Sequence, residues 1–186
     1  MRWSGLFDDL EAQASALDRA TRASEVDERT RIEAGRVPLT DRIRPAAGST
    51  VKITTVGGWL ATGTLRRVSS DWVLVEELGG REVVVMVGAL ISLGGVRRMS
   101  AAPDSLTVVE SRLGIRHLLR GISRDRSPVR IHARDGTVID GTVDRLGSDY
   151  VEVAAHAPGE PRRRADVREV LLVAIPGIAM IRRDSA

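Results

Sequence analysis

The chain has 186 residues, which gives room for one or two small domains with their own cores. It contains no cysteine, which excludes a disulfide framework, a thiolate metal site and a thiol nucleophile. The formal net charge is only +3, and all 28 basic residues except Lys52 are arginines. So strong a preference for arginine is typical of a GC-rich genome. The charge by itself therefore does not indicate nucleic-acid binding.

No apolar run approaches the roughly 20 residues that span a bilayer. The apolar patch at the N-terminus is short, and two acids, Asp8 and Asp9, follow it, unlike a signal peptide. We therefore expect a cytoplasmic protein with no membrane partner.

The N-terminal segment, residues 1–47, is predicted to contain a long charged helix over residues 6–34. No Gly or Pro occurs inside that range, and Gly35 and Pro38 follow it. An apolar stripe at its start has two interpretations. Its side chains either pack on the rest of the chain, as large apolar groups usually do, or anchor a protein partner. The candidate anchor residues are Trp3, Leu6, Phe7 and Leu10.

The chain contains one stretch twice, and the copies are 78 positions apart. The identical pairs are Val51/Val129, Ile53/Ile131, Gly58/Gly136, Gly63/Gly141, Thr64/Thr142, Arg67/Arg145, Ser70/Ser148, Asp71/Asp149, Val73/Val151 and Val75/Val153. Further on, once a longer loop is allowed in the second copy, Glu82-Val83-Val84-Val85 aligns with Glu169-Val170-Leu171-Leu172. A duplication is the simplest explanation.

Alternating apolar residues and turn signals predict five short strands in each copy. In the first copy, after a short helix at 40–44, they cover 51–53, 59–68, 72–76, 82–87 and 91–93. In the second copy they cover 129–133, 137–146, 149–154, 167–174 and 178–181. A glycine inside the second strand and a tight corner before the fifth indicate a small, strongly bent barrel.

The repeat resembles the Sm-like small barrels, the family of the bacterial Sm-like RNA chaperone, within the broader class of SH3-like barrels. The family pattern is Gly-x-x-Ile/Ala-x-Gly-x-hydrophobic, then a turn, Asp, an aromatic residue and alternating valines. The residues that match are Gly58, Ala61, Gly63, Leu65, Asp71, Trp72, Val73 and Val75, and Gly136, Ile139, Gly141, Val143, Asp149, Tyr150, Val151 and Val153. The layout also resembles uncharacterised two-barrel proteins of actinobacteria.

The expected fold is mainly β with helices (α+β). It has two tandem five-stranded SH3/Sm-like barrels at 48–98 and 127–183, each preceded by a helix, in addition to the long N-terminal helix. We expect the copies to pack as an internal pseudo-dimer. For RNA-binding members, the resemblance implies a site with an Asn two residues after the aromatic position. Leu74 and Glu152 occupy those positions here, so that pocket is not expected.

A basic amphipathic helix is predicted at 105–124, between the two copies. Its arginines recur every four residues and form a stripe beside the apolar face. This stripe either tracks the phosphates of a nucleic acid or is an ordinary solvated face. The candidate contacts are Arg112, Arg116, Arg120 and Arg124, with Arg162, Arg163 and Arg164 on a later loop.

No catalytic motif is present. The three histidines have no partners at metal-ligand spacing, and no nucleophile elbow, P-loop or dinucleotide motif occurs. We therefore expect no enzyme activity, no cofactor and no metal. The first hypothesis is a non-catalytic adaptor or regulatory protein that binds an unknown protein through its N-terminal helix. The alternative is an RNA- or DNA-binding protein that uses the arginine stripe.

Overall fold

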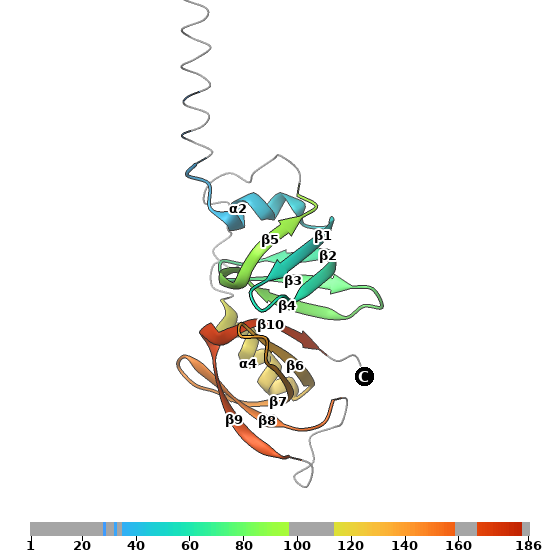
Figure 1. The fold of residues 1–186 in the computed structure, drawn as a ribbon, viewed down its shortest axis with the longest axis vertical. Helices are drawn as coiled ribbons and strands as arrows, with labels where there is room; N and C mark the ends of the chain where they lie inside the picture. The colour runs from blue at the N-terminus through green and yellow to red at the C-terminus, as the bar shows by residue number, and fades with distance from the viewer. Residues whose placement is uncertain (1–27, 29–31, 33–34, 97–113, 159–166, 184–186) are drawn as a thin grey trace, which may run out of the picture. The chain divides into compact units, whose positions relative to one another are not determined.

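The computed structural model describes residues 28, 32, 35–96, 114–158 and 167–183 (Figure 1). The chain divides into two compact units, residues 1–38 and 39–186, and every strand belongs to the second. The helix expected over 6–34 lies outside the described residues, except that Glu28 and Ile32 are helical. None of the described helices has the length and apolar character required to cross a membrane.

The first repeat, as we name residues 39–94, starts with a short helix, α2 (Leu39–Ile43), and a 3-10 turn, η1 (Arg44–Ala46). Pro45 stops the α-helix because it lacks an N–H and clashes with the preceding turn. The strands are β1 (Thr50–Thr55), β2 (Leu60–Val68), β3 (Trp72–Glu77), β4 (Glu82–Met86) and, after the 3-10 turn η2 (Val87–Ala89), β5 (Leu90–Gly94).

The second repeat, residues 115–183, starts with the helix α4 (Ile115–Asp125). The part of the predicted basic helix before residue 114 lies outside the described residues. The strands are β6 (Pro128–Ala133), β7 (Val138–Leu146), β8 (Tyr150–Ala155), β9 (Glu169–Ala174) and, after the 3-10 turn η3 (Ile175–Gly177), β10 (Ile178–Arg183). In both repeats the strands lie where the alternation of apolar residues predicts them.

The prediction of two separate five-stranded barrels is wrong. The ten strands that the structure describes form one antiparallel sheet in the order β5-β1-β2-β3-β4-β10-β6-β7-β8-β9. The two repeats are joined because β4 pairs with β10, with Val85 opposite Met180, Val84 opposite Ile181 and Val83 opposite Arg182. Figure 1 shows the two sets of strands on either side of this joint. Because β4 and β10 are both apolar and pair with each other, the strands of the two repeats form a continuous sheet.

The hydrophobic cores of the two repeats interlock across the joint. Trp72, Val84 and Met86 belong to the first repeat but pack in the core of the second. Met180 belongs to the second repeat but packs in the core of the first. Side chains on successive residues of a strand point to opposite faces, so β4 and β10 each contribute to both cores. The repeats are therefore expected to unfold together.

The strand register corrects the sequence alignment of the two repeats by one residue. Trp72 lies opposite Met86, and its counterpart Tyr150 lies opposite Ala174. Val84 is therefore equivalent to Leu172, which lies 88 positions further on, and not to Leu171. The hydrogen bonds at the start of the 3-10 turns support this register. The Val87 N–H donates to the Asp71 carbonyl at 2.9 Å, and the equivalent Ile175 N–H donates to the Asp149 carbonyl at 2.8 Å. The residues of β4 and β9 are nearly all apolar, so the sequence alone does not distinguish two alignments that differ by one residue.

Candidate functional site

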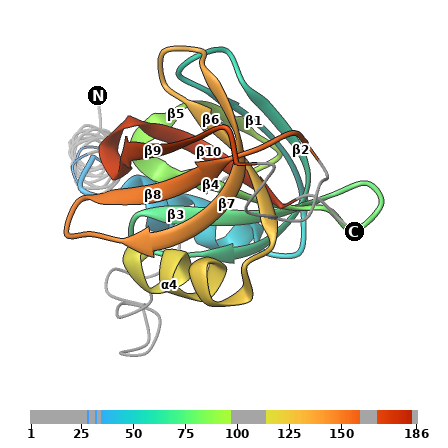
Figure 2. The same ribbon diagram turned by 90° about the horizontal axis from the view of Figure 1, so that it is seen from below.

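Helix α4 forms one wall of the candidate site, and both repeats hold it in place. Its apolar face buries Ile115 and Leu119, which are four residues apart and so lie on one side of the helix. At its start, the Ile115 N–H donates to the Asp71 carboxylate of the first repeat. At its end, Arg126 adopts a left-handed conformation with φ of 53°, and its N–H donates to the Ile122 carbonyl at 3.1 Å. Figure 2 shows α4 along one side of the sheet.

A groove of about 580 Å³ lies between α4 and the outer face of β3 and β4. This volume falls in the range of small-ligand and side-chain pockets. The first repeat contributes Arg67, Trp72, Leu74, Glu82 and Val84. The second contributes His117, Leu118, Arg120, Gly121, Ile122, Arg124, Asp125, Ser127, Val129, Ile181 and Arg183. The groove thus depends on the joint between the repeats.

The floor of the groove is apolar and continuous with the core of the second repeat. Trp72, Val84 and Ile181 are only 3%, 6% and 2% exposed. Leu74, Leu118 and Ile122 are partly buried and pack against the same cluster. Because Trp72 is buried, its ring offers no open face on which a base could stack. The apolar side chains that a ligand can reach are instead the partly buried Leu74, Leu118 and Ile122.

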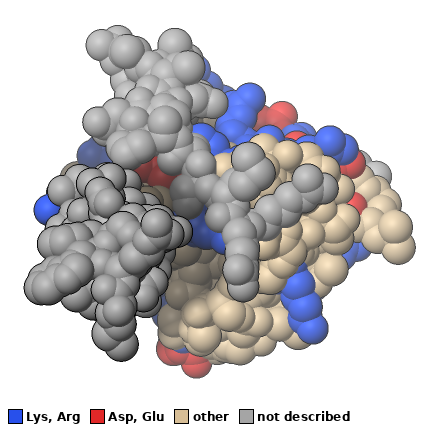
Figure 3. Space-filling model, turned by 90° about the horizontal axis from the view of Figure 1, so that it is seen from above, with Lys and Arg blue, Asp and Glu red and all other residues tan. Residues whose placement is uncertain are grey.

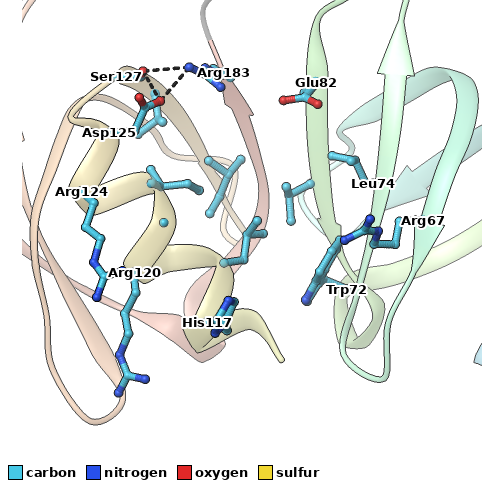
Figure 4. A pocket seen from close by; sticks show the side chains of 16 residues that line it. Arg67, Trp72, Leu74, Glu82, His117, Arg120, Arg124, Asp125, Ser127 and Arg183 are labelled. Atoms are coloured by element: carbon cyan, nitrogen blue, oxygen red, sulfur yellow. Dashed lines mark hydrogen bonds and ion pairs between the residues drawn. The ribbon is translucent and has the colours of Figure 1, made fainter. Parts of the chain in front are cut away.

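The rim of the groove carries arginines in two states. Arg183 is paired, since its guanidinium lies 2.6 Å from the Asp125 carboxylate and donates to the Ser127 hydroxyl at 3.2 Å. Within the described ranges, no carboxylate pairs with Arg67, Arg120 or Arg124. Figure 4 shows Arg67 beside Trp72, whereas Arg120 and Arg124 extend from α4 away from Trp72. Of these three arginines, Arg67 is therefore the one that lies beside the apolar floor.

Arg67 has no carboxylate partner in the described part of the chain because the two repeats differ at one position. In the second repeat, Arg145 lies opposite Glu152 and the two side chains approach to 3.9 Å. In the first repeat, Arg67 lies opposite Leu74, which cannot pair with it. Arg67 was not among the residues predicted from the sequence. The available signal was that the first repeat has Leu74 where the second repeat has Glu152. Glu82 and Arg183 also line the groove, and no sequence pattern pointed to them.

The structure places some of the predicted nucleic-acid contacts on one helix. Arg116, Arg120 and Arg124 are exposed on α4, and Arg116 donates to the Gly147 carbonyl at 3.4 Å. Figure 3 shows one face on which basic side chains are spread out, with acidic side chains between them. The remaining candidates lie outside the described residues: Arg112, Arg162, Arg163 and Arg164, and the proposed anchor Trp3, Leu6, Phe7 and Leu10.

A second cluster of polar groups, on the opposite side of the joint, has a structural role. The ring of Trp59 meets that of His132 edge-on at a centroid distance of 4.5 Å, and its Nε1 donates to the Ala133 carbonyl at 2.8 Å. Arg182 donates to Glu77 and to the Leu60 carbonyl, at 3.1 and 2.5 Å. Burial, helped by the charges of Arg182 and Arg130, lowers the pKa of His132 to about 4.

The polar side chains of the groove differ in how far other residues already engage them. The described residues contain no group of three or more His, Cys, Asp or Glu side chains that could hold a metal ion. In the groove, the Ser127 hydroxyl donates to Asp125 at 2.6 Å, and Asp125 also pairs with Arg183. What remains available to a ligand is the apolar floor and the charged groups of Arg67, Arg120, Arg124 and Glu82. Within the described residues no ion pair engages these four groups.

Neither a protein-family model nor a curated protein matches this sequence.

Proposed function

We propose that this is a non-catalytic interaction protein of the cytoplasm, and that the groove between α4 and the β3–β4 face binds a protein segment. The observation that carries the proposal is Arg67, which has no carboxylate partner among the described residues and lies beside an apolar floor that includes Leu74. The segment would place apolar side chains on the floor and a carboxylate on Arg67. The cytoplasm fits a chain without cysteine, since nothing in it depends on oxidising surroundings.

Two features of the groove favour a peptide over a small polar metabolite. Its floor offers the partly buried side chains of Leu74, Leu118 and Ile122, and apolar pockets are where interface hot spots gather. Arg67 can make a bidentate hydrogen-bonded pair with a carboxylate, which adds direction to the apolar contact. Arg120 and Arg124 would attract acidic residues that flank the bound segment. This attraction would mainly raise the association rate of the segment.

Selection from a displayed random-peptide library, with the whole protein as bait, tests this function. We expect peptides that combine Leu, Phe or Trp with Asp or Glu, and we expect Leu74→Glu to weaken them at least tenfold in fluorescence anisotropy. The introduced carboxylate would pair with Arg67, as Glu152 pairs with Arg145, and would also place a charge on the floor. A tenfold loss corresponds to about 1.4 kcal/mol.

The matched control is Glu152→Leu. It introduces at the equivalent position of the second repeat the residue that the first repeat has, and Glu152 does not line the groove. It should leave peptide affinity unchanged. Selected peptides without acidic residues, or equal affinity for the wild type and Leu74→Glu, would count against the groove as the binding site.

The N-terminal residues Trp3, Leu6, Phe7 and Leu10 remain a second proposed contact with the protein partner. Aromatic and leucine side chains at helical spacing are typical of a helix that docks in a groove of another protein. Deletion of residues 1–34 should then abolish binding of a partner that the full chain captures, while circular dichroism of the sheet stays unchanged. Equal capture by the shortened chain would remove these residues from the proposal.

The alternative function is RNA or DNA binding, and one observation favours it: Arg116, Arg120 and Arg124 are all exposed on α4. The resemblance of the repeat to Sm-like proteins supports the same alternative. Binding that depends on phosphate contacts falls steeply with salt. We would measure anisotropy with single-stranded RNA and duplex DNA at low and near-physiological salt. Loss of binding when all three arginines are changed to Glu would favour this alternative over the peptide.

A further inference from the structure

One end of the groove carries the carboxylate of Glu82, which no ion pair engages within the described ranges. The nearest carboxylates on β3 and α4 are both paired. Glu76, opposite Glu82 on β3, lies 2.6 Å from the Arg66 guanidinium. Asp125 of α4 lies 2.6 Å from the Arg183 guanidinium. Glu82 is exposed, so this end of the groove presents one negative charge that a ligand can reach.

Glu82 and Arg67 lie on the same face of the sheet, with apolar side chains between them. Arg67 lies opposite Leu74, and Leu74 lies opposite Val84. Glu82 precedes Val84 by two residues on β4 and therefore points to the same side. Figure 4 shows the arrangement, with Leu74 between Glu82 and Arg67. The groove thus has opposite charges at two points of its rim and an apolar floor between them.

The strand register gives the distance between the two charged positions. The Cα atoms of Arg67 and Glu82 are separated by two strand spacings and by one step of two residues along a strand. A strand spacing is about 4.8 Å and a two-residue step is about 6.7 Å, so the separation is about 12 Å. In an extended segment, residues four positions apart span about 13 Å. In a helix, the same distance requires about eight residues.

The size of the groove favours an extended segment over a helix. A helix with its side chains is about 10 Å across, so a length of about 12 Å fills roughly 900 Å³. The groove offers about 580 Å³. An extended chain is narrower, and its side chains alternate between two sides. Such a chain can contact the sheet on one side and α4 on the other.

We infer that the groove binds an extended segment in which an acidic and a basic residue are four positions apart, with an apolar residue midway between them. The acidic residue pairs with Arg67, the apolar residue contacts Leu74, and the basic residue pairs with Glu82. The two intervening residues face α4, where Leu118 and Ile122 supply apolar surface. This inference rests on the proposed function, and it adds the conformation of the segment and the basic residue that Glu82 selects.

Selection of displayed random peptides on two baits, the wild type and Glu82→Arg, tests the inference. The wild type should enrich peptides with an acidic and a basic residue four positions apart, in either order along the peptide. Glu82→Arg should enrich peptides in which a second acidic residue replaces the basic one. Enrichment of a spacing of seven or eight positions would overturn the extended conformation.

Fluorescence anisotropy then measures the charge preference on a matched pair of peptides. One is a peptide selected on the wild type, and the other has Glu in place of its basic residue. The wild type should prefer the first by about fivefold, the upper range for one exposed ion pair. Glu82→Arg should prefer the second by about the same factor. Glu82→Gln, which removes the charge without reversing it, should bind the two peptides equally.

The matched control is Glu169→Arg, which makes the same charge change at an exposed carboxylate of β9, outside the groove. It should keep the preference of the wild type. Positions 82 and 169 are both exposed, so the variants should fold, and circular dichroism checks this.

The outcomes separate this inference from the proposed function. If no peptide binds the wild type, or if Leu74→Glu leaves the affinity unchanged, the proposed function fails and the inference fails with it. If Leu74→Glu weakens binding but Glu82→Arg keeps the charge preference of the wild type, the groove still binds a segment. In that case only the inference is overturned.

Discussion

The carboxylate of Asp71 accepts the backbone N–H of Ile115 at 3.0 and 3.2 Å, so a turn of the first repeat caps the helix in front of the second. The first N–H groups of a helix have no partner within it, and a negative charge is favourable there. Gly114, the residue before the helix, has no side chain that could cap it. The helix therefore takes its capping group from the other repeat, and this contact positions one wall of the groove.

Asp71→Ala should lower the free energy of unfolding by about 1 kcal/mol, the usual effect of losing a helix cap. Urea unfolding followed by circular dichroism measures it. The control is Asp149→Ala at the equivalent position, where the exposed carboxylate accepts the Ser148 hydroxyl at 2.9 Å. The same loss in both variants would contradict a capping role for Asp71.

Gly63→Ala and Gly141→Ala should each lower the free energy of unfolding by about 2–3 kcal/mol, the range of an overpacked site. A Cβ at Gly63 would collide with the Glu76 carbonyl, and one at Gly141 with the Ala154 carbonyl. The control is Gly121→Ala in α4, where a Cβ meets nothing within 4 Å. That change should raise stability by up to about 1 kcal/mol, because Ala favours a helix. Thermal unfolding would rank the three variants, and a mild effect at Gly63 would mean that β2 and β3 can separate.

The strands could be predicted from the sequence because each is a local pattern. Alternation places Val51 and Ile53 on one face, and their burial at 1% and 0% agrees with that pattern. Gly63 and Gly141 were likewise recognisable, since a glycine inside a strand indicates close backbone approach. Such features depend on neighbours along the chain and need no knowledge of the partner strand.

The joint between the repeats could not be predicted, because nothing local distinguishes an edge that pairs from one that stays open. Val84 and Leu172 occupy equivalent positions and are both apolar, yet one is buried and the other exposed. The difference depends on which strand lies beside each, a long-range choice between similar edges. The groove was missed for the same reason, since its walls come from both sides of the joint.

Stability should fall as the pH is lowered from about 6.5 to about 4, and His132 should cause part of this fall. Its pKa in the folded protein is about 4, below the ordinary value, so between these pH values the unfolded chain binds the proton more readily. One pKa unit is about 1.4 kcal/mol, so the loss by pH 4 is on the order of 2–3 kcal/mol. Denaturant unfolding at several pH values measures it. His132→Gln should flatten the curve in this window, and an unchanged slope would exclude His132 as a cause.

Arg182→Ala should destabilise the joint by about 3 kcal/mol, the lower end of the range for removing one partner of a largely buried ion pair. Glu77, whose side chain is 16% exposed, would lose its guanidinium partner, and the Leu60 carbonyl would lose a donor. The same variant should raise the pKa of His132, since the Arg182 charge lowers it. The comparison is Arg66→Ala, which breaks the exposed pair with Glu76 and should change stability little. NMR titration of the ring protons reads the pKa, and a His132 pKa that stays near 4 without Arg182 would leave burial and the Arg130 charge as its causes.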